Sequence, residues 1–97
     1  MTLKEIEESI DILIQASGYK RLRWNVRPCS ICGSPVGYIF VGGRVYFDPN
    51  CDCVDYEEPY REETWEDFKH AIELNKDYDI IDKEFREFVN SNKYLLQ

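Results

Sequence analysis

The residues best suited to chemistry in this chain are its four cysteines, which all lie between Arg27 and Val54. They form a C-x-x-C pair, Cys29 and Cys32, and a C-x-C pair, Cys51 and Cys53. Two close pairs of thiolates suit the tetrahedral coordination of a structural zinc ion, and in a reducing cytosol clustered cysteines are more often metal ligands than disulfides. We therefore expect one structural Zn²⁺ per chain, held by these four side chains.

The segment between the two pairs should bring them together. Its apolar runs, 36–41 and 45–47, are separated by Gly42-Gly43, which predicts a two-residue hairpin turn because glycine tolerates positive φ. Cys32 and Cys53 are equally far along the chain from this turn. The hairpin therefore places both cysteine pairs at its open end.

Three other kinds of chemistry use cysteines in similar patterns. A thioredoxin-like redox pair at Cys29 and Cys32 would need a strand-to-helix context, whereas Ser34-Pro35 and a predicted strand follow. The P-C-x-x-C from Pro28 resembles half of a zinc deaminase signature, but no H-x-E precedes it. An iron–sulfur cluster also uses four cysteines and stays open from sequence, and the colour of the purified protein distinguishes it from zinc.

Helices should flank the hairpin. Thr2 and Glu5 have the spacing of a capping box, and the apolar stripe that follows predicts a helix that ends at Gly18, a favourable residue just beyond a helix. Thr64 caps a second helical region, and a break near 75–79 divides it in two.

The expected fold class is α+β: a zinc-pinned antiparallel β-hairpin of two to three strands packed against about three α-helices. We expect a single domain over 1–97, with the N-terminal helix in 1–18, the zinc-binding hairpin in 27–54 and the helical part in 64–92. The hairpin face that should pack against the helices is rich in aromatic residues: Tyr38, Phe40, Val45 and Phe47. The polar composition of 54–63 predicts a connector without regular secondary structure.

Charge is distributed unevenly along the chain. The net charge is −7; residues 1–54 are balanced, whereas residues 55–97 carry thirteen acidic and six basic residues. A generic nucleic-acid binder would be basic, so this balance favours a protein partner. A basic strip nevertheless precedes the first cysteine pair. It indicates either an edge strand whose charges prevent unwanted strand pairing or a strip that contacts phosphates. The candidate partner-binding residues are Lys20, Arg21, Arg23, Trp24, Arg27, Glu57, Glu58, Glu62 and Glu63.

Catalytic residues are not evident in the sequence. His70 is the only histidine and falls on the helix side away from the apolar stripe, where we expect a solvated side chain. There is no nucleophile motif and no phosphate loop, so we expect no enzyme. The N-terminus is acidic and amphipathic, unlike a signal peptide, and no apolar run would span a membrane, so we expect a cytoplasmic protein.

The order of knuckle, hairpin, knuckle and helix over 28–68 is similar to that of zinc-ribbon and treble-clef modules, although the second knuckle is C-x-C where a ribbon has C-x-x-C. More closely, three motifs resemble small zinc-knuckle proteins encoded by bacteriophages and prophages. They are C-x-x-C-G-x-P-x-G-Y at 29–38, Y-F-D-x-x-C-x-C at 46–53 and R-x-x-T-W at 61–65. The resemblance implies a phage accessory protein in a bacterial cytoplasm and implies no activity.

Three functions follow as expectations. The first is a non-catalytic protein that binds a host or phage protein through its acidic surface, as an inhibitor or a nucleic-acid mimic. The alternative is a nucleic-acid-binding zinc ribbon that uses the basic strip 20–27. The third is a thiol redox protein acting through Cys29 and Cys32.

Overall fold

The computed structural model describes residues 1–28, 33, 35–48, 61–75 and 79–97. Its elements follow in chain order: α1 (Leu3–Ser17), β1 (Leu22–Pro28), β2 (Pro35–Val41), β3 (Arg44–Asp48), β4 (Arg61–Glu63), α2 (Trp65–Leu74), α3 (Asp79–Asn92) and the 3₁₀ helix η1 (Lys93–Leu96). The strands form one antiparallel sheet in the order β1-β2-β3-β4.

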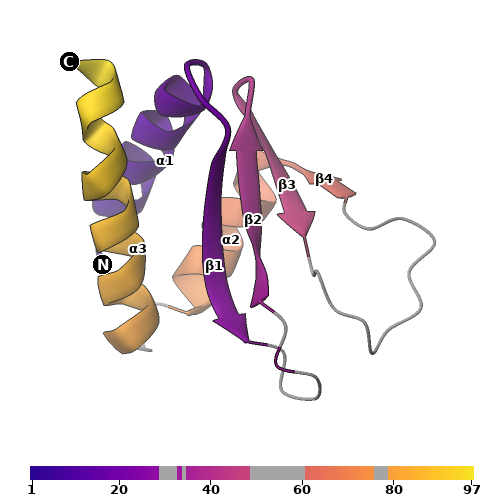
Figure 1. The fold of residues 1–97 in the computed structure, drawn as a ribbon. Helices are drawn as coiled ribbons and strands as arrows, with labels where there is room; N and C mark the ends of the chain where they lie inside the picture. The colour runs from indigo at the N-terminus through magenta and orange to yellow at the C-terminus, as the bar shows by residue number, and fades with distance from the viewer. Residues whose placement is uncertain (29–32, 34, 49–60, 76–78) are drawn as a thin grey trace.

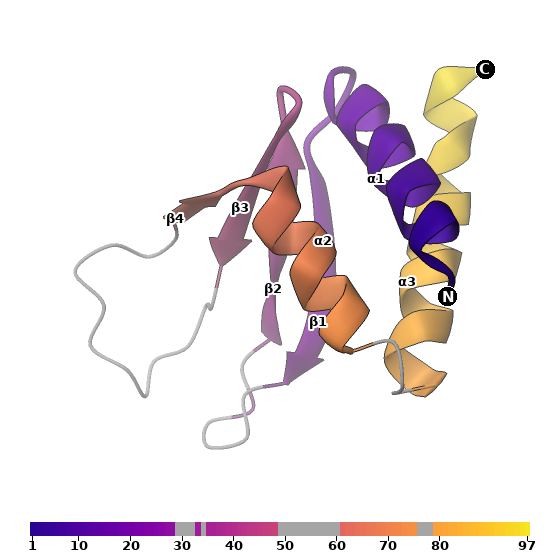
Figure 2. The same ribbon diagram turned by 180° about the vertical axis from the view of Figure 1, so that it is seen from behind.

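The helices and the sheet form two layers. In the view of Figure 2, α2 crosses in front of the strands, and α1 and α3 lie side by side next to β1. Within the part of the chain that the structure describes, no helix covers the other face, which is called the open face below. Three helices over an antiparallel sheet confirm the expected α+β class.

The central hairpin has the predicted register. Tyr38 pairs with Phe47, Phe40 pairs with Val45, and Val41 pairs with Arg44. Gly42 and Gly43 have φ of 60° and 77°, so both turn residues use the left-handed region that glycine permits. Because side chains alternate along a strand, this register fixes which residues face the helices.

The helix-facing side of the hairpin forms the core, as the aromatic pattern predicted. Phe40 and Val45 are fully buried, and Phe68 of α2 lies over them. The Phe68 ring is at 5.3 Å from Phe40 and 4.9 Å from Tyr38, both in edge-to-face contact. Aromatic pairs in this geometry add to the stabilisation from burial itself. Phe68 therefore holds α2 on the hairpin together with Trp65, whose ring stacks on Phe40 at 5.8 Å.

The helix starts were predicted correctly. Thr2 Oγ1 accepts a hydrogen bond from the Glu5 N–H at 3.2 Å, and Thr64 Oγ1 accepts one from the Asp67 N–H at 3.1 Å. α1 ends at Ser17 with Gly18 as its C-cap, as predicted, and the φ of −71° at Gly18 is an ordinary helical angle. In the described ranges no helix is both long enough and apolar enough to cross a bilayer.

β4 corrects the sequence prediction. Residues 61–63 were expected in a polar connector, but Arg61 pairs with Phe47 and Glu63 with Val45, so the sheet has four strands instead of two to three. The run Arg-Glu-Glu has no apolar alternation, because this short edge strand is held by its backbone pairing with β3 and by ion pairs of its side chains. A hydrophobic pattern cannot reveal such a strand.

Candidate metal centre and charged surfaces

The four predicted zinc ligands, Cys29, Cys32, Cys51 and Cys53, lie outside the described residues. The strand ends that carry them are described. Pro28 pairs with Pro35 at one end of the sheet, so the connection 29–34 leaves and returns there. Two further pairs, Gly37–Asp48 and Phe47–Arg61, place both ends of the connection 49–60 at that same end (Figure 1). Both cysteine pairs are therefore attached to one end of the sheet.

The attachment points are close enough for one ion. Adjacent strands are about 4.8 Å apart, so β1 and β3 are separated by about 10 Å. Cys29 follows Pro28 directly, and Cys51 comes three residues after Asp48, a reach of about 10 Å for extended chain. The chain lengths therefore permit the two pairs to meet.

Gly33 supports the knuckle geometry. It has φ of 75°, the left-handed conformation that a turn after the second cysteine of a zinc knuckle requires. A Cβ at this position would meet no atom within 4 Å, so the glycine is needed for its backbone angle and not for space. Among the described residues, no group of three or more His, Cys, Asp or Glu could hold a metal ion.

An ion pair on the open face braces the sheet next to these connections. The Arg23 guanidinium contacts the Asp48 carboxylate, and its Nε donates a hydrogen bond to Asn25 Oδ1 at 2.7 Å. Arg23 is on β1 and Asp48 on β3, so the pair spans β2 where Gly37 has no side chain to obstruct it. This contact holds the end of β3 immediately before the second cysteine connection.

The predicted basic strip divides between surface and core. Lys20 and Arg21 are exposed, and Arg23 is the half-buried residue in the brace. Trp24 is only 5% exposed and packs against Phe85 at 5.0 Å, so it belongs to the core and cannot contact a partner. The side chain of Arg27 is outside the described set. Because side chains alternate along β1, Trp24, the only aromatic residue of this strip, faces the core and not the solvent.

The predicted acidic residues are similarly divided. Glu57 and Glu58 lie outside the described residues. Glu62 is 3.8 Å from Arg44, and Glu63 is 3.7 Å from Arg61. Burial raises the pKa of Glu63 from its ordinary value, against the opposing effect of Arg61. The two glutamates of β4 are thus partly neutralised and do not form the main acidic surface.

The acidic surplus lies on the helices instead. Together α1, α2, α3 and η1 carry eleven acidic and five basic residues, whereas 20–28, 35–48 and 61–63 carry three acidic and six basic. Within these described ranges, the helices and the sheet have opposite net charge. A division of the sequence into halves could not show this, because α1 is acidic and lies in the balanced half.

One lysine lies within the acidic surface of α1 and α2. Lys69 Nζ donates a hydrogen bond to Glu7 Oε1 at 2.8 Å, which is the main cause of its raised pKa, and Glu66 and Glu73 add to that shift. Asp11 follows Glu7 by one helical turn on the same side of α1. We define the α1–α2 acidic surface as Glu7, Asp11, Glu66 and Glu73.

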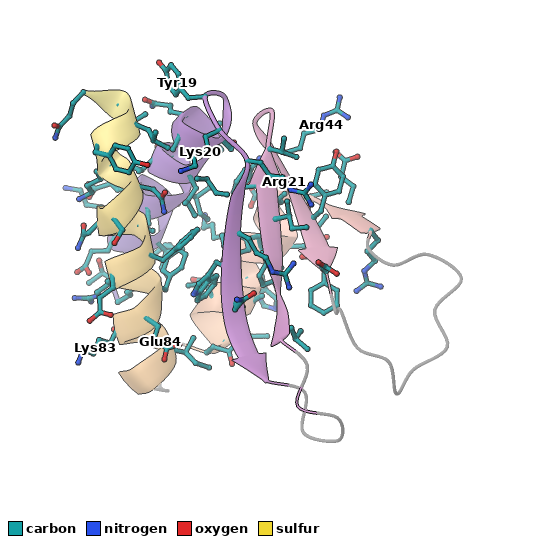
Figure 3. The ribbon with its side chains drawn as sticks, viewed as in Figure 1. Tyr19, Lys20, Arg21, Arg44, Lys83 and Glu84 are labelled. Atoms are coloured by element: carbon teal, nitrogen blue, oxygen red, sulfur yellow. The ribbon has the colours of Figure 1, made fainter. Side chains whose placement is uncertain are left out.

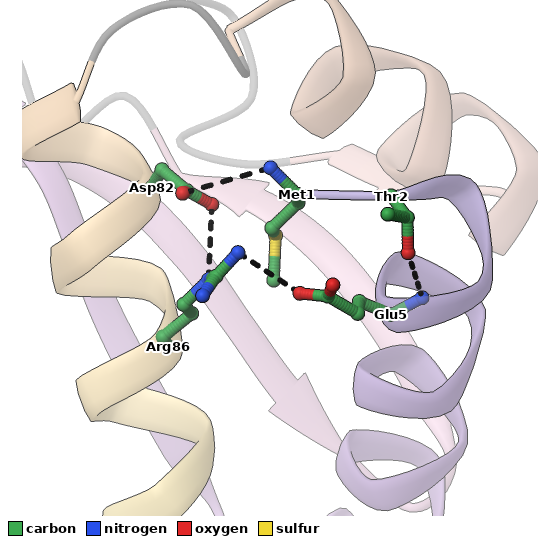
Figure 4. Close-up of polar contacts among 5 residues, drawn as sticks. All are labelled: Met1, Thr2, Glu5, Asp82 and Arg86. Atoms are coloured by element: carbon green, nitrogen blue, oxygen red, sulfur yellow. Dashed lines mark hydrogen bonds and ion pairs between the residues drawn. The ribbon is translucent and has the colours of Figure 1, made fainter.

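A second network joins α1 to α3 (Figure 4). Arg86 lies 2.9 Å from Glu5 Oε2 and 3.5 Å from Asp82 Oδ1, and the Met1 amino group is 3.7 Å from Asp82 Oδ2. The sequence predicted that the Glu5 carboxylate would close the capping box. In the structure, that carboxylate is paired with Arg86 of α3 instead. The i, i+4 spacing of Asp82 and Arg86 was the only sequence signal for this network.

His70 is exposed, as predicted. The described titratable group most affected by burial is Tyr38, whose pKa is raised to about 12, first by burial and then by Glu63. This group lies under Phe68 in the core and has no nucleophile beside it among the described residues. Its environment is that of a structural residue.

Stability should fall at high pH because of Tyr38. Its pKa is raised from 10.0 in the unfolded chain to about 12 in the fold, so the unfolded state loses the phenolic proton first. The stabilisation is complete below about pH 10 and is lost as pH rises towards 12. Urea unfolding across this window should show a smaller fall for Tyr38→Phe than for the native chain, and equal falls in both would contradict the assignment.

Comparisons of this chain with protein-family models, curated proteins and solved structures found no match.

Proposed function

We propose that this chain is a non-catalytic interaction protein whose sheet is clasped by one structural Zn²⁺ at Cys29, Cys32, Cys51 and Cys53. Its acidic helical layer binds a basic site on another protein. As the sequence resemblance implies, the partner would be a host or phage protein in a bacterial cytoplasm. The observation that carries the proposal is the separation of charge between the two layers.

The zinc clasp is supported by the shared attachment of both cysteine pairs to one end of the sheet. The register of three strand pairs places both connections there, and Gly33 has the backbone angle of a knuckle. Zinc with four thiolates has no open coordination position for a substrate, so the metal serves the fold. This favours a binding protein over an enzyme and over thiol redox chemistry.

The acidic partner surface is supported by its position on regular helices. Glu7 and Asp11 are on α1, and Glu66 and Glu73 are on α2, and Lys69 of α2 is bonded to Glu7 of α1. Carboxylates on packed helices keep a fixed spacing, as a mimic of a phosphate backbone requires. Complementary charge of this kind mainly accelerates association and selects partners.

A charge-reversal experiment tests the surface. The native chain, the Asp11→Lys/Glu73→Lys variant and the Glu84→Lys/Glu87→Lys variant would each be immobilised and exposed to lysate of the host bacterium. The last variant makes the same charge change on exposed positions of α3, which is a separate helix. Proteins retained by the native chain and the α3 variant should be lost from the α1–α2 variant. Equal retention by all three, or by none, would contradict the proposal.

A further inference from the structure

The end of the molecule opposite the cysteine connections is built from three segments that are distant in sequence. The Gly42 N–H donates to the Ser17 carbonyl at 2.9 Å, and the Gly43 N–H donates to Ser17 Oγ at 3.0 Å. These bonds fix the β2–β3 turn against the end of α1. Lys20 Nζ is 3.4 Å from the Tyr94 hydroxyl, which adds η1 to the same end.

This end concentrates the exposed large apolar side chains of the described residues. Tyr19 is 71% exposed, Tyr94 is 54% exposed and Val41 is 38% exposed; Leu3 and Leu74 are the other two in the described part and lie on helices α1 and α2. A tyrosine that is mostly exposed presents a flat ring to solvent. The two exposed rings are on adjoining segments, because Lys20, which follows Tyr19, contacts the Tyr94 hydroxyl.

The charges around these rings are basic. Lys20, Arg21 and Arg44 are exposed, and they are the only charged residues in 18–21 and 41–44. Figure 3 shows Tyr19, Lys20, Arg21 and Arg44 along this end of the molecule. Arg44 is 3.8 Å from Glu62, and because both side chains are mostly exposed, this pairing is weak and can be exchanged for another anion.

The open face continues this surface in register. Leu22 pairs with Phe40 and faces the helices, so Val41, the last residue of β2, is on the open face at this end of the sheet. Val41 pairs with Arg44 at the start of β3, and Arg21 directly precedes β1. We define the Tyr19 surface as Tyr19, Lys20, Arg21, Val41, Arg44 and Tyr94.

We propose that the Tyr19 surface binds single-stranded nucleic acid. Phosphates contact Lys20, Arg21 and Arg44, and unpaired bases stack on Tyr19 and Tyr94, the combination used by single-strand binding proteins. A duplex hides the faces of its bases, whereas a single strand can use the cations and the exposed tyrosine rings together. The acidic helical layer repels a polyanion elsewhere, which confines the strand to this end. The surface is distinct from the α1–α2 acidic surface and the proposal does not depend on the latter.

Fluorescence anisotropy with a fluorescein-labelled oligothymidylate of about 12 nucleotides, at low salt, tests the proposal on the full chain. Tyr19→Ala and Arg21→Ala should each weaken binding by about fivefold or more, because each removes a stacking or phosphate contact. Lys83→Ala should have no effect, because Lys83 is an exposed lysine on α3 near the other end of the molecule (Figure 3). Circular dichroism would verify that each variant is folded.

Two further arms define what overturns the proposal. The logarithm of the binding constant should fall with the logarithm of salt concentration, and Arg21→Ala should reduce that slope by roughly 0.7, the contribution of one single-strand phosphate contact. An abasic strand of equal length should bind more weakly and should be insensitive to Tyr19→Ala. The proposal is overturned by absence of binding at low salt, by equal loss in Lys83→Ala, or by a polyglutamate that competes as well as the oligonucleotide.

Discussion

Replacing Gly37 by alanine is expected to destabilise the protein by about 3 kcal/mol or more. A Cβ on this residue would lie 2.1 Å from the Trp24 carbonyl oxygen, 3.0 Å from the Trp24 carbonyl carbon and 3.1 Å from the Asn25 Cα. These are backbone atoms of the paired strand, so they cannot rotate aside as a side chain would. The strand pair must separate locally, next to a β-bulge between Asn25 and Arg27.

The consequence extends beyond one strand pair. Trp24 is part of the core. Because Gly37 has no side chain, the Arg23 side chain can cross β2 and reach Asp48. Separation of β1 from β2 at this point would therefore disturb both faces of the sheet. It would also displace the strand ends that carry the two cysteine connections.

Gly18→Ala is the matched control. Gly18 has φ of −71°, which alanine adopts readily, and its Cβ would meet only the Gln15 carbonyl at 3.2 Å. This substitution should change the free energy of unfolding by no more than about 1 kcal/mol. Urea denaturation of both variants gives the comparison. If Gly37→Ala and Gly18→Ala were equally stable, the close approach at Gly37 would be wrong.

Removal of zinc by a strong chelator is expected to unfold the chain under mild heating. Structural zinc contributes on the order of 10 kcal/mol to apparent folding free energy, which is comparable with the whole stability of a domain of this size. The connection between β1 and β2 has six residues, and the connection between β3 and β4 has twelve. The ion would link these two connections. Without it, both connections regain their conformational entropy.

Far-UV circular dichroism during a thermal scan measures this effect. The chelated protein should melt well below the untreated protein, and added zinc, but not added magnesium, should restore the original transition. Magnesium serves as the control because it prefers oxygen ligands and does not suit four thiolates. An identical melting curve before and after chelation would show that the fold does not depend on the metal.

The local structure around the hairpin could be predicted from sequence. Gly42-Gly43 determines the turn, and the turn determines the register, so the inward-facing positions of Phe40 and Val45 followed without tertiary information. The caps at Thr2 and Thr64 were predictable for the same reason, since each depends on residues within one helical turn.

Features that depend on distant residues were not predicted. β4 has no hydrophobic pattern, and its pairing with β3 crosses a connection of twelve residues. Trp24 was grouped with the arginines beside it, although alternation along the strand directs it into the core. The contact of Tyr94 with Lys20 joins residues 74 positions apart, so no local pattern could assign the Tyr19 surface.

The candidate metal site combines a feature that the sequence predicted and features that it did not. The cysteine spacing and the hairpin predicted that both pairs would be attached to one end of the sheet, and the register of the described strands agrees with this. Coordination by Cys29, Cys32, Cys51 and Cys53 stays a prediction. The opposite charge of the helices and the sheet could be recognised only from the fold, because it depends on which helices cover which face.

Native mass spectrometry of the purified chain tests the zinc site. We expect a mass increased by one Zn²⁺ per chain, with the metal lost from variants in which Cys29 or Cys51 is replaced by serine. A chain that carries no metal, carries an iron–sulfur cluster, or has its cysteines paired as disulfides would contradict the zinc clasp.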